Sequence, residues 1–486
     1  MITPASESKI VSCGVIGYPM GLMSAAAIEF QYKYAYPSQL VATGRREVVQ
    51  LATSGGAAAF PYFFQGQLKF PRLTARLLFT LGRVVATRFH LPAAMLKRII
   101  EEHDPVVTSG GGLLRFEGFS ACCSTFGRVD LEPESYDGVV VGQGTTNVDF
   151  NAALRAALAQ IRDDEKVGLA VGAEEVALLR GADQIVERKV KLPLRWLKGF
   201  VEAQAYQSRM EVRARLNKIE ALRFLRSLPR TVMAKTSYWV VPAGGGLRLS
   251  QREGPRALRL AGLERLRLLD DLAPLADGLV VYADARGEAS EWQLSFGPLR
   301  FHLTLSAEVW RGFSGEGQVL SDLAAKERDR LLKLAQGLLK WQAEIRSQEF
   351  AANWGASPGA LRQAFAALGS RGLVGYDLSR GSYFHRELPF DMALVEEMHP
   401  RLQSARKLVA GGGVHLLSQS DAQVEAEVSG PEVTHRVRLS DAGDRCTCPW
   451  HAKYQGARGP CKHILAVQMS VAGDGEESEQ YNQTGK

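Results

Sequence analysis

Four residues near the C-terminal end of the sequence have the types and spacing of a metal site. Cys446 and Cys448 are one residue apart, and after twelve intervening residues Cys461 and His463 repeat that spacing. Three thiolates and one imidazole are a common tetrahedral ligand set for structural Zn²⁺. Glycines in the intervening loop allow the chain to turn back on itself. The sequence therefore predicts one zinc ion held by these four side chains.

The elements around the four residues must bring the two pairs together. At a strand end, residues two apart point to the same side, so Cys446 and Cys448 can hold one ion. We expect two strands before them, at 423–428 and 433–439, and a helix starting at Ile464. A helix N-terminus favours a thiolate nearby. His451, in the loop, is an alternative ligand, but the paired spacing favours His463.

Four basic residues flank these ligands. The stretch from Arg445 to Lys462 also contains Lys453 and Arg458, and it has no Asp or Glu. A cationic surface around a closed metal site favours an anionic partner surface. We therefore expect Arg445, Lys453, Arg458 and Lys462 to contact a protein partner or DNA.

The chain of 486 residues is long enough for two to four domains, and its 46% hydrophobic content is that of a globular protein. Its helical and strand patterns predict an α+β fold. We expect a mixed helical region at 1–105, with a helix opening at Pro71, and a strand-rich domain at 106–310. A helical segment at 318–400, a zinc module at 401–472 and a disordered acidic tail at 473–486 follow.

Residues 187–230 carry twelve Lys or Arg and only four Glu. We expect basic helices here, one of them from Met210 to Leu228. Arg195 and Lys198 flank Trp196, and basic helices with aromatic residues are one way to follow a phosphate backbone. Arg195 and Lys198 are therefore candidate contacts for nucleic acid or another partner, although a solvated basic face is the alternative.

The segment 318–400 begins with a long helical pattern at 320–350. A capped helix at 357–368 and a hairpin with its tip at 379–382 follow, and this order is that of a winged helix. The second helix would offer only Arg362 and Gln363 for reading bases. This segment therefore predicts a winged-helix-like fold more clearly than it predicts DNA recognition.

Catalytic motifs are missing from the sequence, which has no Walker motif, nucleophile elbow, zinc-protease helix or dinucleotide fingerprint. Four protein ligands would also leave the metal no position for water. Glu117 with Cys122 or Cys123 is the one candidate for catalysis, and a buried pair of thiols is the simpler interpretation. We expect no enzymatic activity.

Six cysteines, three of them in the predicted metal site, favour a reducing compartment, so we expect a cytoplasmic protein. Residues 11–28 carry no charge and have the length of a membrane span. Their glycines, serines and proline favour a buried strand, turn and helix instead. The net charge of +7 permits an anionic partner without requiring one.

The order strand, strand, helix with Cys-X-Cys and Cys-X-His closely resembles the SWIM zinc finger, over about residues 420–470. The four ligands match its pattern, and Pro449 and 462–466 fill further positions usual in that family. The rest of the chain is similar to a bacterial family of SWIM-finger proteins. The segments that carry this second resemblance are 51–56, 104–108, 114–123 and 192–200.

This second resemblance implies an adaptor that works with a MoxR-type AAA+ ATPase and a von Willebrand factor A protein. SWIM fingers in general are implied to bind DNA or protein. We therefore expect a zinc-binding adaptor, with DNA binding through the finger and the basic helices as the alternative.

Overall fold

The computed structural model describes most of the chain between residues 40 and 471. The described ranges are 40–43, 46–49, 62–89, 105–139, 143–147, 150, 152–172, 176–180, 183–187, 192, 194–230, 238–285, 287, 289–315, 317–324, 329–339, 341–388, 399–420, 422–430 and 433–471. The uncharged run 11–28 and the acidic segment 473–486 lie outside them. Among the described helices, none combines the length and apolar character needed to cross a membrane.

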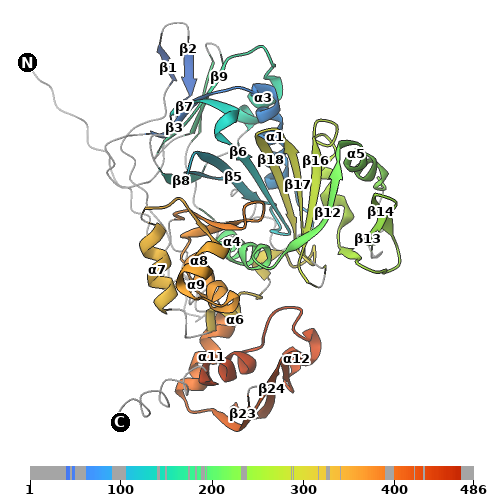
Figure 1. Ribbon diagram of the computed structural model, residues 1–486, viewed down its shortest axis with the longest axis vertical. Helices are drawn as coiled ribbons and strands as arrows, with labels where there is room; N and C mark the ends of the chain where they lie inside the picture. The colour runs from blue at the N-terminus through green and yellow to red at the C-terminus, as the bar shows by residue number, and fades with distance from the viewer. Residues whose placement is uncertain are drawn as a thin grey trace, which may run out of the picture. The chain divides into compact units, whose positions relative to one another are not determined.

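An antiparallel sheet of eight strands forms the centre of the fold (Figure 1). Residue pairing between β18 and β6, far apart in sequence, joins its two halves, with Leu299 opposite Leu131. The strand order is β12 (Glu211–Asn217), β16 (Gly278–Ala283), β17 (Ser290–Phe296), β18 (Leu299–Leu305), β6 (Thr125–Leu131), β5 (Leu113–Phe119), β4 (Val106–Gly110) and β8 (Gly144–Asn147).

Helix α1 (Pro71–Ala86) packs on the apolar face of this sheet, and its start at Pro71 confirms the sequence prediction. Two glycines of the sheet make room for it. A Cβ on Gly118 would lie 2.6 Å from Cγ2 of Val85, and one on Gly127 would lie 2.9 Å from Cδ1 of Leu81. Such distances are too short for carbon atoms in contact, so these two positions allow the helix to approach the strands closely.

A second antiparallel sheet has the order β11 (Asp183–Glu187), β10 (Val176–Arg180), β9 (Val167–Gly172), β3 (Tyr62–Leu68) and β7 (Tyr136–Val139). Strand β3 pairs with both β7 and β9. The expected boundary at residue 105 therefore does not separate two sheets, because strands from both sides of it pair. The other elements of these regions are β1 (Leu40–Thr43), β2 (Arg46–Val49), α3 (Ala152–Gln160), β13 (Tyr238–Ala243), β14 (Gly246–Ser250) and β15 (Leu258–Leu260).

The helix expected from Met210 to Leu228 is wrong in its first half. Residues 211–217 form β12, which pairs with β16, and the helix α5 (Lys218–Ser227) begins only afterwards. Asn217 caps α5, and its side chain accepts hydrogen bonds from the backbone N–H groups of Ile219 and Glu220. This capping box fixes the helix start. Ile219, in the first turn of α5, is 67% exposed.

Helix α4 (Leu194–Gln207) precedes this region, and residues 320–388 form a compact unit of short elements. The single long helix expected at 320–350 is wrong, because strand β19 lies within that stretch, at Glu344–Arg346. The elements are α6 (Leu320–Ala324), α7 (Asp329–Leu339), β19 (Glu344–Arg346), α8 (Ser347–Trp354), α9 (Pro358–Ser370), β20 (Val374–Asp377) and β21 (Ser382–His385). Helix α9 is buried along its second half.

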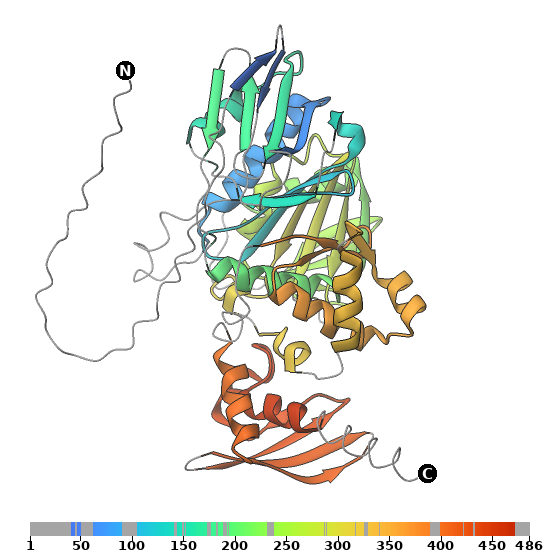
Figure 2. The same cartoon turned by 90° about the vertical axis from the view of Figure 1, so that its left-hand side faces the viewer.

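The C-terminal module is a four-stranded antiparallel sheet with helices on one face, as Figures 1 and 2 show. Its elements are α11 (Pro400–Ala410), β22 (Val414–Gln419), β23 (Gln423–Ser429), β24 (Thr434–Ser440), β25 (Arg445–Cys446), α12 (Pro449–Tyr454) and a last helix at 462–471. The two expected strands and the last helix are confirmed. Strand β22 and helix α12 were not expected.

Candidate metal centre and buried ionic cluster

The four predicted ligands come together at the junction of two strands and two helices. Cys446 ends β25, Cys448 is the N-cap residue of α12, and Cys461 and His463 lie at the start of the last helix. All four are buried, and their ligand atoms lie within 4.8 Å of one another. The group can therefore hold a metal ion such as zinc.

The spacing of the ligand atoms suits a tetrahedral ion. Sγ of Cys446 lies 3.7 Å from Nδ1 of His463. Zn–S and Zn–N bonds of about 2.3 and 2.0–2.1 Å at tetrahedral angles place S and N about 3.6 Å apart. The donor set of three sulfurs and one nitrogen also fits zinc better than hard cations, which prefer oxygen. His451 is not part of the group.

Backbone amides support the sulfurs. The N–H groups of Cys448, His451 and Ile464 each point to a cysteine sulfur at 3.4 Å, which favours thiolate over thiol. A hydrogen bond from Cys446 and others from neighbouring groups lower the pKa of Cys461 to about 4, whereas the pKa of Cys446 is raised. A dication would relieve this crowding of negative charge, because it attracts all three sulfurs.

The four basic residues expected around the ligands form two pairs with different surroundings. Arg445 and Lys462 are exposed, and each is the immediate neighbour of a cysteine ligand. Lys453 and Arg458 lie over the ring of Tyr454, at 5.2 and 4.8 Å from its centroid. The guanidinium of Arg458 is also 5.4 Å from the ring of Trp450. Cations and aromatic rings therefore alternate on α12 and the turn after it.

The basic residues expected on a helical face in 187–230 are less accessible. Arg195 and Lys198 lie on α4 and are both partly buried. Burial lowers the pKa of Lys198. Between them, Trp196 is fully buried and packs against Phe119 and Phe200. This helix is thus anchored by its aromatic residue, which does not lie on an open binding face.

The candidate catalytic group is divided among different partners. Glu117 is buried and accepts a hydrogen bond of 2.9 Å from Arg386. Cys123 is buried with φ of 54°, and desolvation raises its pKa to about 12, so its thiol stays protonated. Sγ of Cys122 lies 3.4 and 3.2 Å from the hydroxyls of Ser120 and Ser124. None of these contacts links Glu117 to Cys122 or Cys123.

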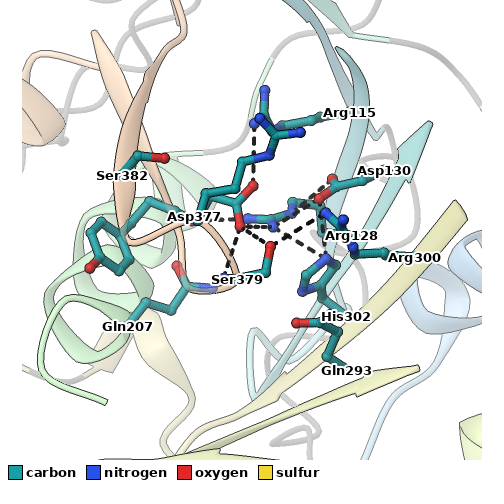
Figure 3. A network of polar contacts seen from close by, with 12 residues as sticks. Arg115, Arg128, Asp130, Gln207, Gln293, Arg300, His302, Asp377, Ser379 and Ser382 are labelled. Carbon is teal, nitrogen blue, oxygen red and sulfur yellow. Dashed lines mark hydrogen bonds and ion pairs between the residues drawn. The ribbon is translucent and has the colours of Figure 1, made fainter. Parts of the chain in front are cut away.

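A second polar site, which sequence reasoning missed, lies on the other face of the eight-stranded sheet (Figure 3). Eight ionisable side chains meet there, and each is at most 2% exposed. They are Arg115 and Glu117 on β5, Arg128 and Asp130 on β6, Glu291 on β17, His302 on β18, Asp377 on β20 and Arg386 just after β21. We call these eight residues the ionic cluster.

Asp377 connects the β20–β21 hairpin to the sheet within the ionic cluster. Its carboxylate lies 3.3 Å from Arg115 and 3.3 Å from Arg128, and it also accepts hydrogen bonds from Ser379. Arg128 donates to the carbonyl of Tyr376 at 2.9 Å. Burial opposes ionisation of Asp377, but the two arginines outweigh it and hold the pKa of Asp377 far below its usual range. The hairpin is thus fastened by buried charge pairs.

His302 occupies the middle of the ionic cluster between two carboxylates. Its Nδ1 lies 2.9 Å from Glu291 and its Nε2 lies 3.1 Å from Asp130. Burial and the nearby Arg128 oppose protonation, yet the pKa of His302 is raised because the two carboxylates outweigh them. Three arginines face four carboxylates in the cluster, so an imidazolium balances the charge. The two flanking carboxylates therefore favour the protonated form of His302, although Arg128 also lies 3.3 Å from its Nε2.

Comparisons with known proteins add little to this geometry. No protein-family model matches the chain, and no curated protein matches it. Among solved structures, the Proliferating Cellular Nuclear Antigen from Entamoeba histolytica is similar at 11% sequence identity and a TM-score of 0.34. That match covers 50% of this chain and 98% of that one.

Proposed function

We propose that the chain is a non-catalytic adaptor whose C-terminal module is stabilised by a zinc ion and binds a protein partner. The observation that carries the proposal is the buried group Cys446, Cys448, Cys461 and His463. Four protein ligands fill a tetrahedral zinc ion and leave no position for water or substrate. The metal would then stabilise a surface, and that surface would perform the function.

The proposed partner class rests on the resemblance of the rest of the chain to a bacterial family of SWIM-finger proteins. That resemblance implies a MoxR-type AAA+ ATPase together with a von Willebrand factor A protein. A recognition module needs a packed core, and the finger has one. Val424, Ala426, Val428 and Val437 of its sheet pack with Ile464 and Val467 of the last helix as a cluster of their own.

Affinity purification of the tagged chain from its native cells tests the adaptor role. We expect an AAA+ ATPase or a von Willebrand factor A protein to co-purify after nuclease treatment, and to be lost with the Cys461→Ser variant. Retention of the same partner by Cys461→Ser, or loss of all partners on nuclease treatment, would contradict an adaptor role for the zinc-clipped module.

Direct DNA binding is the second candidate, favoured by Lys453 and Arg458 over Tyr454 and Trp450. Cations attract the phosphates, and aromatic rings can stack on unpaired bases. A DNA-binding module would lose affinity steeply between 50 and 200 mM salt, by about ten-fold or more for a few phosphate contacts. An adaptor that captures a protein would keep its partner over that range.

Helix α9 and the hairpin after it do not enter this proposal. Only Arg362 and Gln363 are partly exposed polar residues in its second turn, and the rest of the helix from Ala364 is buried. Arg380 at the hairpin tip lies 2.7 Å from Glu132. Helix α9 thus offers only Arg362 and Gln363 for base contacts, and the arginine at the hairpin tip is already paired within the chain.

A further inference from the structure

A groove of about 530 Å³ runs beside the metal ligands on the C-terminal module. Its lining is mainly apolar and includes Val433, which is 58% exposed, together with Pro449 and Trp450. Its floor includes the metal ligands Cys448, Cys461 and His463. An open apolar groove on a small module is a site where a partner side chain can be buried.

The cations of the groove define the kind of chain that fits it. Lys462 is exposed at its edge. The guanidinium of Arg401 lies over the ring of Trp450 at 4.7 Å and donates hydrogen bonds to the carbonyls of Arg458 and Pro460. The groove therefore combines an apolar lining with two positive charges, of which Arg401 is held in place and Lys462 is exposed. A peptide that is complementary to the groove has acidic residues near one aromatic side chain.

The sequence contains such a peptide directly after the last helix. Asp474, Glu476, Glu477 and Glu479 are followed by Tyr481, and residues 472–486 contain no other aromatic residue. The groove lies at the N-terminal end of the helix at 462–471, and the acidic segment leaves from its C-terminal end.

The length of the segment allows it to return to the groove. A helix of ten residues is about 15 Å long, since each residue adds about 1.5 Å. Ten extended residues, from 472 to 481, span up to about 33 Å. Tyr481 can therefore pass back along the whole helix with length to spare.

We propose that residues 473–481 of this chain occupy the groove, with Tyr481 against Trp450 and Val433 and with the acidic residues near Lys462 and Arg401. This inference deepens the proposed function and rests on it, because the groove would then be the partner-binding surface of the finger. A partner must displace the segment, so the chain regulates its own adaptor surface. The partner segment that competes would share its chemistry of acidic residues and an aromatic anchor.

Fluorescence anisotropy with a fluorescein-labelled peptide of residues 472–486 tests the proposal on the full-length chain. The comparison protein carries a neutral tail (D474N, E476Q, E477Q, E479Q and Y481A), so its groove has no competitor. A tethered segment acts at an effective concentration of about 1 mM. We expect the peptide to bind the neutral-tail chain about ten-fold or more tightly than the wild-type chain.

Two charge reversals in the neutral-tail chain locate the site. Lys462→Glu places a negative charge at the groove and should reduce peptide affinity about ten-fold or more. Arg445→Glu is the matched control, because Arg445 is also exposed and also adjacent to a cysteine ligand but does not line the groove. It should change the affinity less than about two-fold. Zinc content and circular dichroism of both variants check that the module is folded.

Several results would overturn the proposal. Equal affinity of the peptide for the wild-type and neutral-tail chains would show that the segment does not occupy the groove. Equal losses with Lys462→Glu and Arg445→Glu would show unspecific charge attraction, and no binding at all would exclude the segment as occupant. These outcomes are separate from failure of the adaptor role, because capture of the ATPase or von Willebrand factor A partner is measured without the peptide.

Discussion

At the scale of single residues, Cys446, Cys448, Cys461 and His463 were predictable because their spacing is local. Each pair is set by one strand end or helix start, and the loop between them only has to close. The choice of His463 over His451 followed from the repeated spacing, and the gathered group has His463. His451 contributes only its backbone N–H, donated to the sulfur of Cys448.

Replacing one ligand tests the metal site. Purified wild-type protein should contain about one zinc per chain by inductively coupled plasma mass spectrometry, and Cys461→Ser should contain almost none, because one ligand of the tetrahedron is lost. Cys122→Ser is the control, since Cys122 lies outside the group and should leave the zinc content unchanged. Wild-type protein without zinc, prepared without chelators, would contradict the site.

The buried carboxylate of Asp377 should have a large effect on stability. Asp377→Asn removes the buried carboxylate that Arg115 and Arg128 share and leaves them only Glu344 and Asp130 as partners, and breaking a buried pair costs about 3–5 kcal/mol in the free energy of unfolding. Glu349→Gln is the control, because its pair with Arg346 is exposed and contributes less than about 1 kcal/mol. Similar losses in urea unfolding for both variants would disprove the assigned role.

At the scale of elements, the alternation in β5 and β6 was visible in the sequence, but what covers these strands was not. Arg115 and Glu117 alternate with apolar residues, as do Arg128 and Asp130, and such a pattern is typical of a solvated polar face. The structure buries that face instead. The covering residue Asp377 is 262 positions from Arg115, and no local signal relates two such distant segments.

Strand β12 shows a different limit of sequence reading. The spacing of Val212, Leu216 and Ile219 suits a helix, but Val212, Ala214 and Leu216 also alternate as in a strand. The capping box at Asn217 decides between the two, because a helix that starts there cannot include residues 211–216. When a capping box lies inside a stretch with helical spacing of apolar residues, the cap is therefore the better guide to where the helix starts.

The ionic cluster should make stability depend on pH through His302. Its pKa is raised on folding, above the value of about 6.5 in an unfolded chain. The contribution of protonated His302 to the free energy of unfolding is therefore fully present below about pH 6.5. It is lost as the pH rises through the pKa that His302 has in the folded protein. We expect the free energy of unfolding in urea to fall as the pH rises above about 6.5, and to fall less in His302→Gln.

Nuclear magnetic resonance of the wild-type protein checks the same point without a substitution. The ¹⁵N shifts of the His302 ring should be those of an imidazolium above pH 6.5, because both ring nitrogens donate to carboxylates. Shifts of a neutral ring at that pH, or parallel pH profiles for wild type and His302→Gln, would refute the charged state.

At the scale of the whole molecule, the C-terminal module and the large sheet have separate apolar clusters. A module this small gains much of its stability from the metal. We expect chelation to remove hydrogen-exchange protection from residues 414–471 and to leave strands β17 and β18 protected. Mass-spectrometric hydrogen exchange measures both regions at once. Loss of protection in β17 and β18 would mean that the two parts unfold together.

The pairing of β18 with β6 also has a consequence for how the protein is made. Leu131 cannot pair with Leu299, its partner in the sheet, until Leu299 has been synthesised. At translation rates of about 5–20 residues per second, that interval is roughly 10–30 s. Throughout it, the growing chain presents β6 as an open strand edge that can pair with other chains. The central sheet can therefore be completed only after β18 has been synthesised.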